Sequence, residues 1–478
     1  MNDRIFREYD IRGVADRDLP DEVVFALGQG LGTLLFERGG DTLALGRDGR
    51  LHSPRIHQAF LAGLLSTGAH VLDVGIVPSP VLYFATHVLG VQGGAQITGS
   101  HNPPADNGLK LLLFGEHLSG DKLRALSRLC RAATFRRGQG RQLSAHHVQA
   151  DYLRFVTERL QLSSRRFPVV LDAGHGAGGP LGLALFQSLG FPTHPLGCKP
   201  DGHFPLHPPD PTQPENLRAL QQAVSATHAE AGFALDGDAD RLVVVDSRGR
   251  QVAGDLLFLL LAKAILAEQK GARFVCEVRH SRTILKEIER AGGQPIVWQV
   301  GHTRIKEKMV EVQAALGAET SGHLFFAHRY LGFDDGLYAA ARVLELLSQT
   351  PQTLADLVDA LPVLHMTPEF RIPVPESLKK QVVEKVAWRL SQDPAVRLEQ
   401  IDGVSAFWPD AWALLRQSHT QAAVCLRLEA ENDERLQTVQ KQVRALISAV
   451  LSEHEPDGDF CPRSTSEPDG VQTLTRSR

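Results

Sequence analysis

A serine in residues 98–103, with the sequence Thr-Gly-Ser-His-Asn-Pro, could carry a covalent group on its hydroxyl. Gly99 gives the backbone freedom just before Ser100. Apolar residues over 91–97 and 109–114 flank the segment, which predicts a turn between two strands. By itself a serine in such a turn is more often an ordinary turn residue. A reactive role for Ser100 therefore requires partners elsewhere in the chain.

Three aspartates alternate with small residues in residues 235–241, Leu-Asp-Gly-Asp-Ala-Asp-Arg. If this segment is extended, Asp236, Asp238 and Asp240 share one face and can converge. Three carboxylates this close repel one another unless a cation lies among them, and oxygen ligands of this kind suit Mg²⁺. A calcium-binding EF-hand loop fits poorly, because the twelfth position counted from Asp236 is Ser247 and not glutamate. The segment therefore predicts a magnesium site.

Two further segments carry groups suited to sugar hydroxyls and proton transfer. Residues 301–303 read Gly-His-Thr after an apolar stretch, and residues 319–323 read Glu-Thr-Ser-Gly-His before another. We expect a helix over residues 306–316 between them. A carboxylate, a hydroxyl and an imidazole within five residues can hydrogen-bond a sugar and move protons. A lone histidine is more often structural, so His302 and His323 count as evidence only together.

Residues 416–420, Arg-Gln-Ser-His-Thr, lie between two apolar stretches and could bind an anion. Arg416 can contact two phosphate oxygens with its guanidinium fork, while Ser418, Thr420 and nearby backbone N–H groups can complete the site. Taken alone, such a segment is more often an ordinary polar turn.

These segments follow a repeated strand, turn, helix and strand pattern. The pattern occurs over residues 42–75, 168–196 and 273–300, and it predicts α/β domains with mixed, largely parallel sheets. In such sheets ligands bind at the carboxyl ends of the strands. Residues 370–453 differ, with short predicted strands and two helices, and they favour a smaller α+β domain. The predicted fold class is therefore α/β, with three similar α/β domains and a smaller C-terminal α+β domain.

The predicted domain boundaries follow these patterns. The domains are residues 1–150 with Ser100, 151–256 with the aspartates, 257–366 with the segment 319–323, 367–454 with Arg416, and a disordered tail over 455–478.

Composition narrows the class of protein. The chain has 478 residues and a formal net charge of −4, which gives no reason to expect binding to nucleic acid or to an acidic membrane. No apolar run reaches membrane-spanning length, and the charged N-terminus is unlike a signal peptide. The five cysteines are scattered and form neither a disulfide framework nor a metal-binding pattern, so we expect a cytoplasmic protein.

Taken in order, the five polar segments resemble those of the α-D-phosphohexomutases. The opening residues 6–13, Phe-Arg-Glu-Tyr-Asp-Ile-Arg-Gly, and residues 332–336, Gly-Phe-Asp-Asp-Gly, are similar to the bacterial phosphomannomutase/phosphoglucomutase branch. The resemblance extends to about residue 453. It implies four domains around a central cleft and an isomerase that interconverts hexose 1-phosphate and hexose 6-phosphate of mannose or glucose.

The resemblance also implies roles for individual residues. Ser100 would carry a phosphoryl group, and Ser100 with the three aspartates would hold Mg²⁺. A sugar 1,6-bisphosphate would be both intermediate and activator. The candidates for proton transfer or charge stabilisation are Lys110, His302, His323 and Arg12. The implied substrate contacts are Tyr9, Arg241, Arg279, Gly301, His302, Glu319, Ser321, His323, Arg416, Ser418, His419 and Thr420. Arg279 occupies a place where close relatives carry lysine, and it brings a wider fork of donors.

Other functions remain open from the sequence. A phosphatase with an aspartyl nucleophile would use Asp236, with Asp334 and Asp335 as a later acidic pair, but it leaves Ser100 and Arg416 unexplained. A phosphoglucosamine mutase and a catalytically impaired sugar-phosphate sensor are further alternatives. We expect small hexose phosphates as partners, no nucleic acid, no membrane, and a monomer or weak homo-oligomer.

Overall fold

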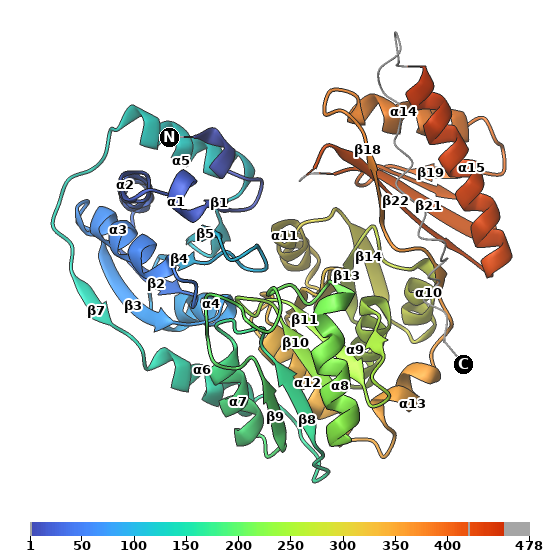
Figure 1. Cartoon of the computed structure of the whole chain (residues 1–478), viewed down its shortest axis with the longest axis horizontal. Helices are drawn as coiled ribbons and strands as arrows, with labels where there is room; N and C mark the ends of the chain where they lie inside the picture. Colours follow the sequence, from blue (N-terminus) through green and yellow to red (C-terminus); the bar gives the residue numbers. More distant parts are fainter. Residues whose placement is uncertain (1, 419–420, 454–478) are drawn as a thin grey trace. The chain divides into compact units, whose positions relative to one another are not determined.

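The computed structural model describes residues 2–418 and 421–453, and the chain forms two compact units (Figure 1). Unit 1 comprises Met1–Phe274 and Gly301–Ala360, and unit 2 comprises Val275–Val300 and Leu361–Arg478. His419, Thr420 and the predicted tail over 455–478 lie outside the described residues. Among the described helices, none has the length and apolar character needed to cross a membrane.

Unit 1 begins with a mixed sheet in the strand order β1-β5-β4-β2-β3-β7, with β6 paired to β5. Strand β2 pairs in parallel with β3 and β4, whereas β5 runs antiparallel to β4 and β1. The strands are β1 (Ile11–Val14), β2 (Thr42–Arg47), β3 (His70–Ile76), β4 (Gly93–Ile97), β5 (Asp106–Leu113), β6 (Glu116–His117) and β7 (Gln142–Ser144). The helical segments are η1 (Asp3–Ile5), α1 (Ala15–Asp18), α2 (Asp21–Glu37), α3 (Ser53–Leu65), α4 (Ser79–Val88), α5 (Gly120–Ala132) and α6 (Val148–Thr157).

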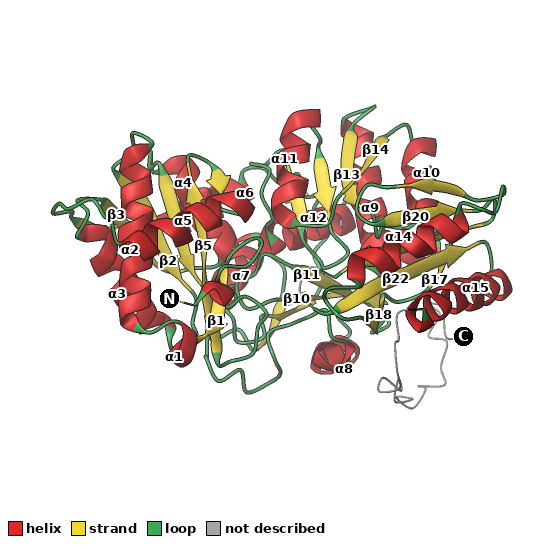
Figure 2. Ribbon diagram, turned by 90° about the horizontal axis from the view of Figure 1, so that it is seen from above, coloured by secondary structure: helices red, strands yellow, loops and turns green. Residues whose placement is uncertain are grey.

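Helices flank the strands of this first sheet, as Figure 2 shows. Residues of β2 and β4 are buried because helices cover the sheet, as expected for α/β layers. Helices α2 and α3 pack closely through glycines: a Cβ at Gly63 would lie 2.2 Å from the carbonyl oxygen of Phe25. The turn after β2 and the turn between β4 and β5 both belong to this sheet, and these turns hold site residues.

A second sheet of unit 1 has the order β12-β11-β10-β8-β9. Strands β8 and β10 are parallel, and β10 and β11 form an antiparallel pair whose connection is residues 236–241. The strands are β8 (Val169–Asp172), β9 (Thr193–Leu196), β10 (Ala231–Leu235), β11 (Leu242–Asp246) and β12 (Gln251–Val252). The helical segments are α7 (Gly179–Ser188), η2 (Pro214–Leu217) and α8 (Arg218–Thr227). The aspartate segment therefore joins two fully buried strands.

The rest of unit 1 contains the hairpin of β15 (Leu316–Ala318) and β16 (Leu324–Phe326). Its helices are α9 (Gly254–Glu268), α11 (His302–Val312), α12 (Gly336–Ser348) and α13 (Leu354–Asp359). The predicted helix over 306–316 was displaced by about one turn, because α11 begins at His302. Gly301 has a φ of 131°, which glycine tolerates, and this turns the chain sharply into the helix.

Unit 2 contains an antiparallel sheet in the order β17-β22-β21-β20-β19, with β18 paired to β22. The strands are β17 (His365–Met366), β18 (Phe370–Pro373), β19 (Arg397–Glu399), β20 (Val404–Phe407), β21 (Ala411–Gln417) and β22 (Ala423–Ala430). Helices α14 (Lys379–Leu390) and α15 (Asp433–Ser452) supply apolar residues to the same core. The chain enters this unit within β13 (Arg273–Glu277) and continues through α10 (Arg282–Arg290) and β14 (Gln294–Trp298). The α+β prediction for the C-terminal part is confirmed, and Arg416 lies in strand β21, not in a turn.

Candidate active site

Ser100 lies in the connection between β4 and β5, and its side chain is buried. Its backbone adopts a left-handed conformation with φ of 48°, and its N–H donates to Oγ1 of Thr98 at 2.8 Å. Oγ of Ser100 donates to Oδ2 of Asp236 at 2.9 Å. A turn that looked exposed in the sequence is thus enclosed, because the aspartate segment packs against it.

Arg50 holds the loop of residues 98–106 in place. This role of Arg50 was not predicted from the sequence. The guanidinium is fully buried and donates to four backbone carbonyl oxygens, those of Ser100, Asn102, Pro103 and Asp106, at 2.6–3.0 Å. A Cβ at Gly99 would lie 2.6 Å from the guanidinium carbon, so glycine is required there. The contact spans about fifty residues of sequence, so no local spacing could have revealed it.

The aspartates converge through a turn and not through the extended segment expected from the sequence. Ala239 has a left-handed φ of 56°, and its N–H donates to the carbonyl oxygen of Asp236 at 3.0 Å. Oδ1 of Asp236 accepts from the N–H groups of Asp240 and Arg241 at 3.1 and 3.2 Å. The turn thus satisfies these buried backbone donors, as buried backbone groups require.

The turn also approaches the Ser100 loop closely. A Cβ at Gly237 would lie 2.4 Å from the carbonyl oxygen of Ser100, so no larger residue fits without movement. The glycine that alternates with the aspartates therefore allows the two loops to touch.

Lys110 lies among the aspartates, on strand β5. Its ammonium group donates to Oδ2 of Asp238 at 2.6 Å and also to Oδ2 of Asp240. Burial opposes the charge, but Asp238 and Asp240 outweigh it and raise the pKa of Lys110 well above its usual value. Burial likewise raises the pKa of Asp236 well above its usual value, with Asp240 and Asp238 contributing. For Asp238 the effects of Lys110 and the Ser79 hydroxyl exceed that of burial and lower the pKa.

The three aspartates fit a divalent cation. One carboxylate oxygen from each lies within 4.8 Å of the others. Oδ1 of Asp238 and Oδ1 of Asp240 are buried and lack a hydrogen-bond partner in the described part of the chain. Because unpaired buried carboxylate oxygens are costly, these atoms are suited to a hard cation that takes oxygen ligands.

Arg12 and Tyr9 border the same region from the N-terminus. The Arg12 guanidinium donates to Oδ2 of Asp10 and to Oδ1 of Asn102, both at 2.6 Å, and so reaches the Ser100 loop. The ring of Tyr9 lies against Gly301, where a Cβ would come within 2.3 Å of its hydroxyl oxygen. Its centroid is 5.2 Å from that of His302.

The segment 319–323 is a tight turn fixed to its neighbours. Oε1 of Glu319 accepts from the N–H of Gly301 at 2.7 Å, and the N–H of Glu319 donates to the carbonyl oxygen of His323 at 3.0 Å. A β-bridge joins His323 to Arg241, directly after the aspartates. Ser321 lies in the same turn and is half-buried. The structure therefore brings this segment, residues 301–302 and the aspartate turn together in unit 1.

His302 lies at the start of α11 among other rings. Burial lowers its pKa well below the usual value, and Lys306 adds to the effect. The ring stacks on that of His323, with centroids 5.7 Å apart.

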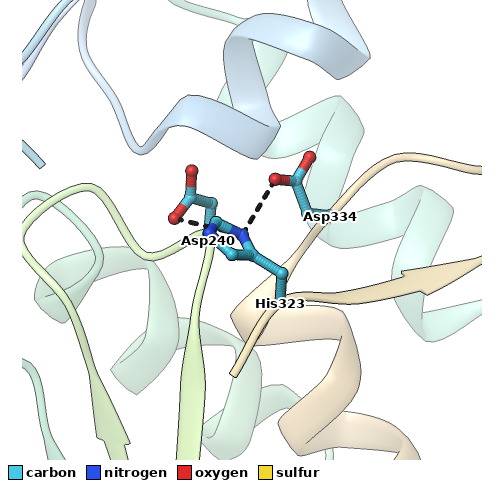
Figure 3. A group of neighbouring side chains, drawn as sticks. All are labelled: Asp240, His323 and Asp334. Carbon is cyan, nitrogen blue, oxygen red and sulfur yellow. Dashed lines mark ion pairs between the residues drawn. The ribbon is translucent and has the colours of Figure 1, made fainter. Parts of the chain in front are cut away.

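His323 lies between two carboxylates, as Figure 3 shows. Nδ1 is 3.0 Å from Oδ2 of Asp334 and 3.7 Å from Oδ1 of Asp240. The other nitrogen, Nε2, accepts from Nε of Arg241 at 3.0 Å. Burial would raise the pKa of Asp334, but Lys306 and His323 lower it well below the usual value. From the sequence, Asp334 was considered only as part of the acidic pair of a phosphatase, and Lys306 was not assigned to the site. The contacts of Asp334 with His323 and with Lys306 appear only in the folded chain.

Unit 2 contains the remaining residues of the expected site. Arg416 is buried, its Nη2 is 3.2 Å from Oδ2 of Asp402, and Nε and Nη2 have no hydrogen-bond partner in the described part of the chain. Such nitrogens are suited to an anion. Nε of Arg279 donates to Oε2 of Glu277 at 2.6 Å.

Lys379 holds the backbone after Arg416, and no sequence pattern pointed to this residue. Its ammonium group donates to the carbonyl oxygens of Ser418 and Gln421 at 2.7 and 3.3 Å. Oγ of Ser418 accepts from the N–H of Gln421 at 3.1 Å. His419 and Thr420, which complete this expected segment, lie outside the described residues.

Comparison with known proteins agrees with this organisation. Residues 3–137, 150–249 and 253–364 match the descriptions of alpha/beta/alpha domains I, II and III of phosphoglucomutase/phosphomannomutase. A phosphomannomutase/phosphoglucomutase of Pseudomonas aeruginosa is 38% identical over 448 residues, covering 94% of this chain and 96% of the relative. A phosphoglucomutase of Neisseria gonorrhoeae is 37% identical over 448 residues, and the match covers 93% of this chain and 97% of the relative.

A solved structure from Burkholderia thailandensis, described as a phosphoglucomutase/phosphomannomutase family protein, superimposes with a TM-score of 0.89 at 37% identity. The match covers 94% of this chain and 98% of the Burkholderia thailandensis chain. The fold class of three α/β domains with a smaller C-terminal domain is therefore confirmed. The chain belongs to the phosphoglucomutase/phosphomannomutase family, isomerases of the bacterial branch of the α-D-phosphohexomutases.

Proposed function

We propose that the protein interconverts hexose 1-phosphate and hexose 6-phosphate of mannose, glucose or both, through a phosphoserine at position 100. The observation that carries the proposal is the 2.9 Å contact between Oγ of Ser100 and Oδ2 of Asp236. It places a hydroxyl beside three buried carboxylates that fit a divalent cation. The family relatives named above support the same activity.

In the proposed reaction Ser100 carries the phosphoryl group before the sugar arrives. A hydroxyl oxygen of the sugar phosphate attacks phosphorus, and the bond between phosphorus and Oγ of Ser100 breaks as the new bond forms. The hydroxyl proton passes to Nε2 of His323, which already acts as an acceptor. Lys110 gives a proton to Oγ of Ser100 as this oxygen leaves phosphorus. The resulting sugar 1,6-bisphosphate then returns its other phosphoryl group to Oγ by the reverse steps, with His323 giving back the proton.

Charged side chains stabilise the transferring group in this proposal. Asp236, Asp238 and Asp240 would hold Mg²⁺, which when bound offsets negative charge on the transferring phosphoryl group. Lys110 also supplies positive charge, because its raised pKa keeps the ammonium group protonated before the transfer. Arg12 reaches the Ser100 loop through Asn102 and adds a second positive charge.

Recognition of the sugar phosphate involves several residues. Glu319 and Ser321 contact sugar hydroxyls, with Tyr9, Arg241, Gly301 and His302 bordering the sugar. Arg416 binds the phosphate that is not being transferred. This role is supported by its buried Nε and Nη2, which have no hydrogen-bond partner in the described residues, although Nη2 is ion-paired with Asp402. We propose Arg279, Ser418, His419 and Thr420 as further phosphate contacts. A cytoplasmic location is proposed as well, supported by the four cysteines in the described part of the chain, which are buried and not joined in disulfides.

Intact-protein mass spectrometry and a coupled assay test the proposal. We expect the purified protein to carry one phosphoryl group on Ser100, and to turn over glucose 1-phosphate and mannose 1-phosphate when a sugar 1,6-bisphosphate and Mg²⁺ are present. Ser100→Gly removes the hydroxyl while accepting the left-handed backbone, so it should lose nearly all activity and still fold. Ser66→Ala is the control, because the Ser66 hydroxyl contacts only the α2–α3 region.

Other outcomes would identify the alternatives. An acyl phosphate on Asp236 with an unmodified Ser100 would show an aspartyl phosphatase. Faster turnover of glucosamine 1-phosphate than of the two hexose phosphates, by kcat/KM, would show a phosphoglucosamine mutase. Binding of hexose phosphate without turnover would show a sensor.

A further inference from the structure

His323 has both ring nitrogens committed to neighbouring side chains, and these contacts determine where its proton lies. An arginine side chain only donates hydrogen bonds. Because Nε of Arg241 donates to Nε2 of His323, Nε2 must present its lone pair. The proton of the neutral ring is therefore on Nδ1, which faces Asp334 (Figure 3).

Nδ1 of His323 and Oδ2 of Asp334 are natural partners for each other. They are 3.0 Å apart, and both are buried without any other hydrogen-bond partner in the residues that the structure describes. Buried polar atoms are rarely left unpaired, so each of these atoms is the available partner of the other. Asp334 is completely buried, so its carboxylate cannot turn out to solvent and is held by the side chains around it.

Lys306 holds the other oxygen of Asp334. Its ammonium group is 3.2 Å from Oδ1 of Asp334 and donates to Nε2 of His117 at 2.7 Å. His117 belongs to β6 of the first sheet, whereas Lys306 belongs to α11. A continuous chain of polar contacts thus runs from His117 through Lys306 and Asp334 to His323.

A second metal ion is the rival explanation, since Asp240, His323 and Asp334 have the spacing of a metal site. The proton on Nδ1 of His323 argues against a second metal ion, because a nitrogen that carries a proton cannot bind a metal. The local charge is also against it. Lys110 contacts Asp240, Lys306 contacts Asp334 and Arg241 contacts His323, so positive groups already surround the two carboxylates.

We propose that Asp334 is a positioning residue that holds His323 as the tautomer with the proton on Nδ1, and that Lys306 holds Asp334 in place. This inference deepens the proposed function and rests on it for the role of His323. The arrangement presents the Nε2 lone pair to a sugar hydroxyl once Arg241 turns away. It parallels the general arrangement in which a carboxylate orients a histidine that accepts a proton.

Histidine ¹⁵N spectroscopy tests the tautomer directly. Long-range ¹H–¹⁵N spectra of histidine-labelled protein, with the His323 signal assigned by its loss in His323→Gln, should show a protonated Nδ1 and an unprotonated Nε2. In Asp334→Asn the new amide N–H can donate to Nδ1, so the proton should move to Nε2. The same variant should lower kcat by about 100-fold or more and change KM little, because the base is misdirected while sugar contacts remain.

Asp335→Asn is the matched control. Asp335 is also fully buried, but it accepts from Tyr152 and Tyr330 and caps α12 through the N–H of Tyr338. Asn at this position should leave the His323 spectrum and kcat of the folded protein unchanged. If Asp334→Asn is poorly folded, Lys306→Gln provides a second variant. It should lower kcat less and leave a mixture of tautomers.

Three results would overturn the proposal. The first is a protonated Nε2 in the wild-type protein, and the second is equal loss of kcat in Asp334→Asn and Asp335→Asn. The third is binding of two Mg²⁺ or Mn²⁺ ions per chain with loss of the Nδ1 proton, which would make His323 a metal ligand. Because the spectra require no substrate, a failed mutase assay with the predicted tautomer would refute the proposed function and leave the positioning intact.

Discussion

Replacing Arg50 with lysine should loosen the loop that carries Ser100 while keeping the buried positive charge. Arg50 uses two nitrogens to reach four carbonyl oxygens, whereas the lysine ammonium has three donors on one atom. We expect about two of the four hydrogen bonds to be lost. At about 1 kcal/mol for each bond, the free energy of opening the loop should fall by about 2 kcal/mol.

Hydrogen exchange measured by mass spectrometry checks this magnitude. A loss of about 2 kcal/mol corresponds to roughly 30-fold faster exchange in peptides over residues 98–106, with other peptides unchanged. The mutase assay should show kcat reduced by up to about 100-fold, because the serine hydroxyl is no longer held in one position.

Arg47→Lys is the control for this experiment. Arg47 is the last residue of β2, just before the turn that contains Arg50, and it is partly buried. In the described part of the chain its Nη1 donates only to the carbonyl oxygen of the neighbouring Asp48. Unchanged exchange over residues 98–106 in Arg50→Lys, or the same increase in Arg47→Lys, would refute the reasoning.

Three more perturbations test other parts of the structure. Gly237→Ala places a Cβ 2.4 Å from the Ser100 carbonyl oxygen, so kcat should fall about tenfold or more in the coupled assay; full activity would contradict the close packing. Asp238→Asn should raise the Mg²⁺ concentration needed for half-maximal activity by at least about tenfold, and an unchanged requirement would exclude Asp238 as a ligand. His207 has a pKa raised above the usual value because Asp172 and the Pro208 carbonyl outweigh burial. Its stabilising charge is fully present below about pH 6.5 and is lost as pH rises through the raised value, so His207→Gln should lower Tm more near pH 5.5 than near pH 8.5. Equal Tm losses at the two pH values would contradict that assignment.

The sequence predicted those parts of the fold that depend on local pattern. Two of the predicted repeats begin at residues 42 and 168, within one residue of the starts of β2 and β8, because apolar runs and glycine turns mark these strands. The start of α11 was wrong by four residues, since the charged Lys306 and Lys308 looked like a helix beginning. The true start at His302 depends on Gly301 and its contact with Glu319, which is distant in sequence.

The site was predictable in its residue types and less so in its geometry. Asp236, Asp238 and Asp240 were identified correctly as a group, but the reason given was wrong, because a turn and not strand alternation brings them together. Arg50 was missed, and Asp334 was considered only for a phosphatase, because the contacts of both residues with the site are made only in the folded chain. Charged residues of this kind look like surface residues until the fold shows that they are buried.

The left-handed backbone of Ser100 has a consequence for how this family can change during evolution. Glycine is the residue that tolerates that conformation most easily, so a change from serine to glycine would be neutral or favourable for the fold. Under the proposed function, the requirement for a phosphoryl carrier is what keeps serine at position 100. A descendant that has glycine there and retains Arg50 and Gly237 would preserve the shape of the loop, and it would be recognisable from sequence as a protein that binds sugar phosphates without converting them.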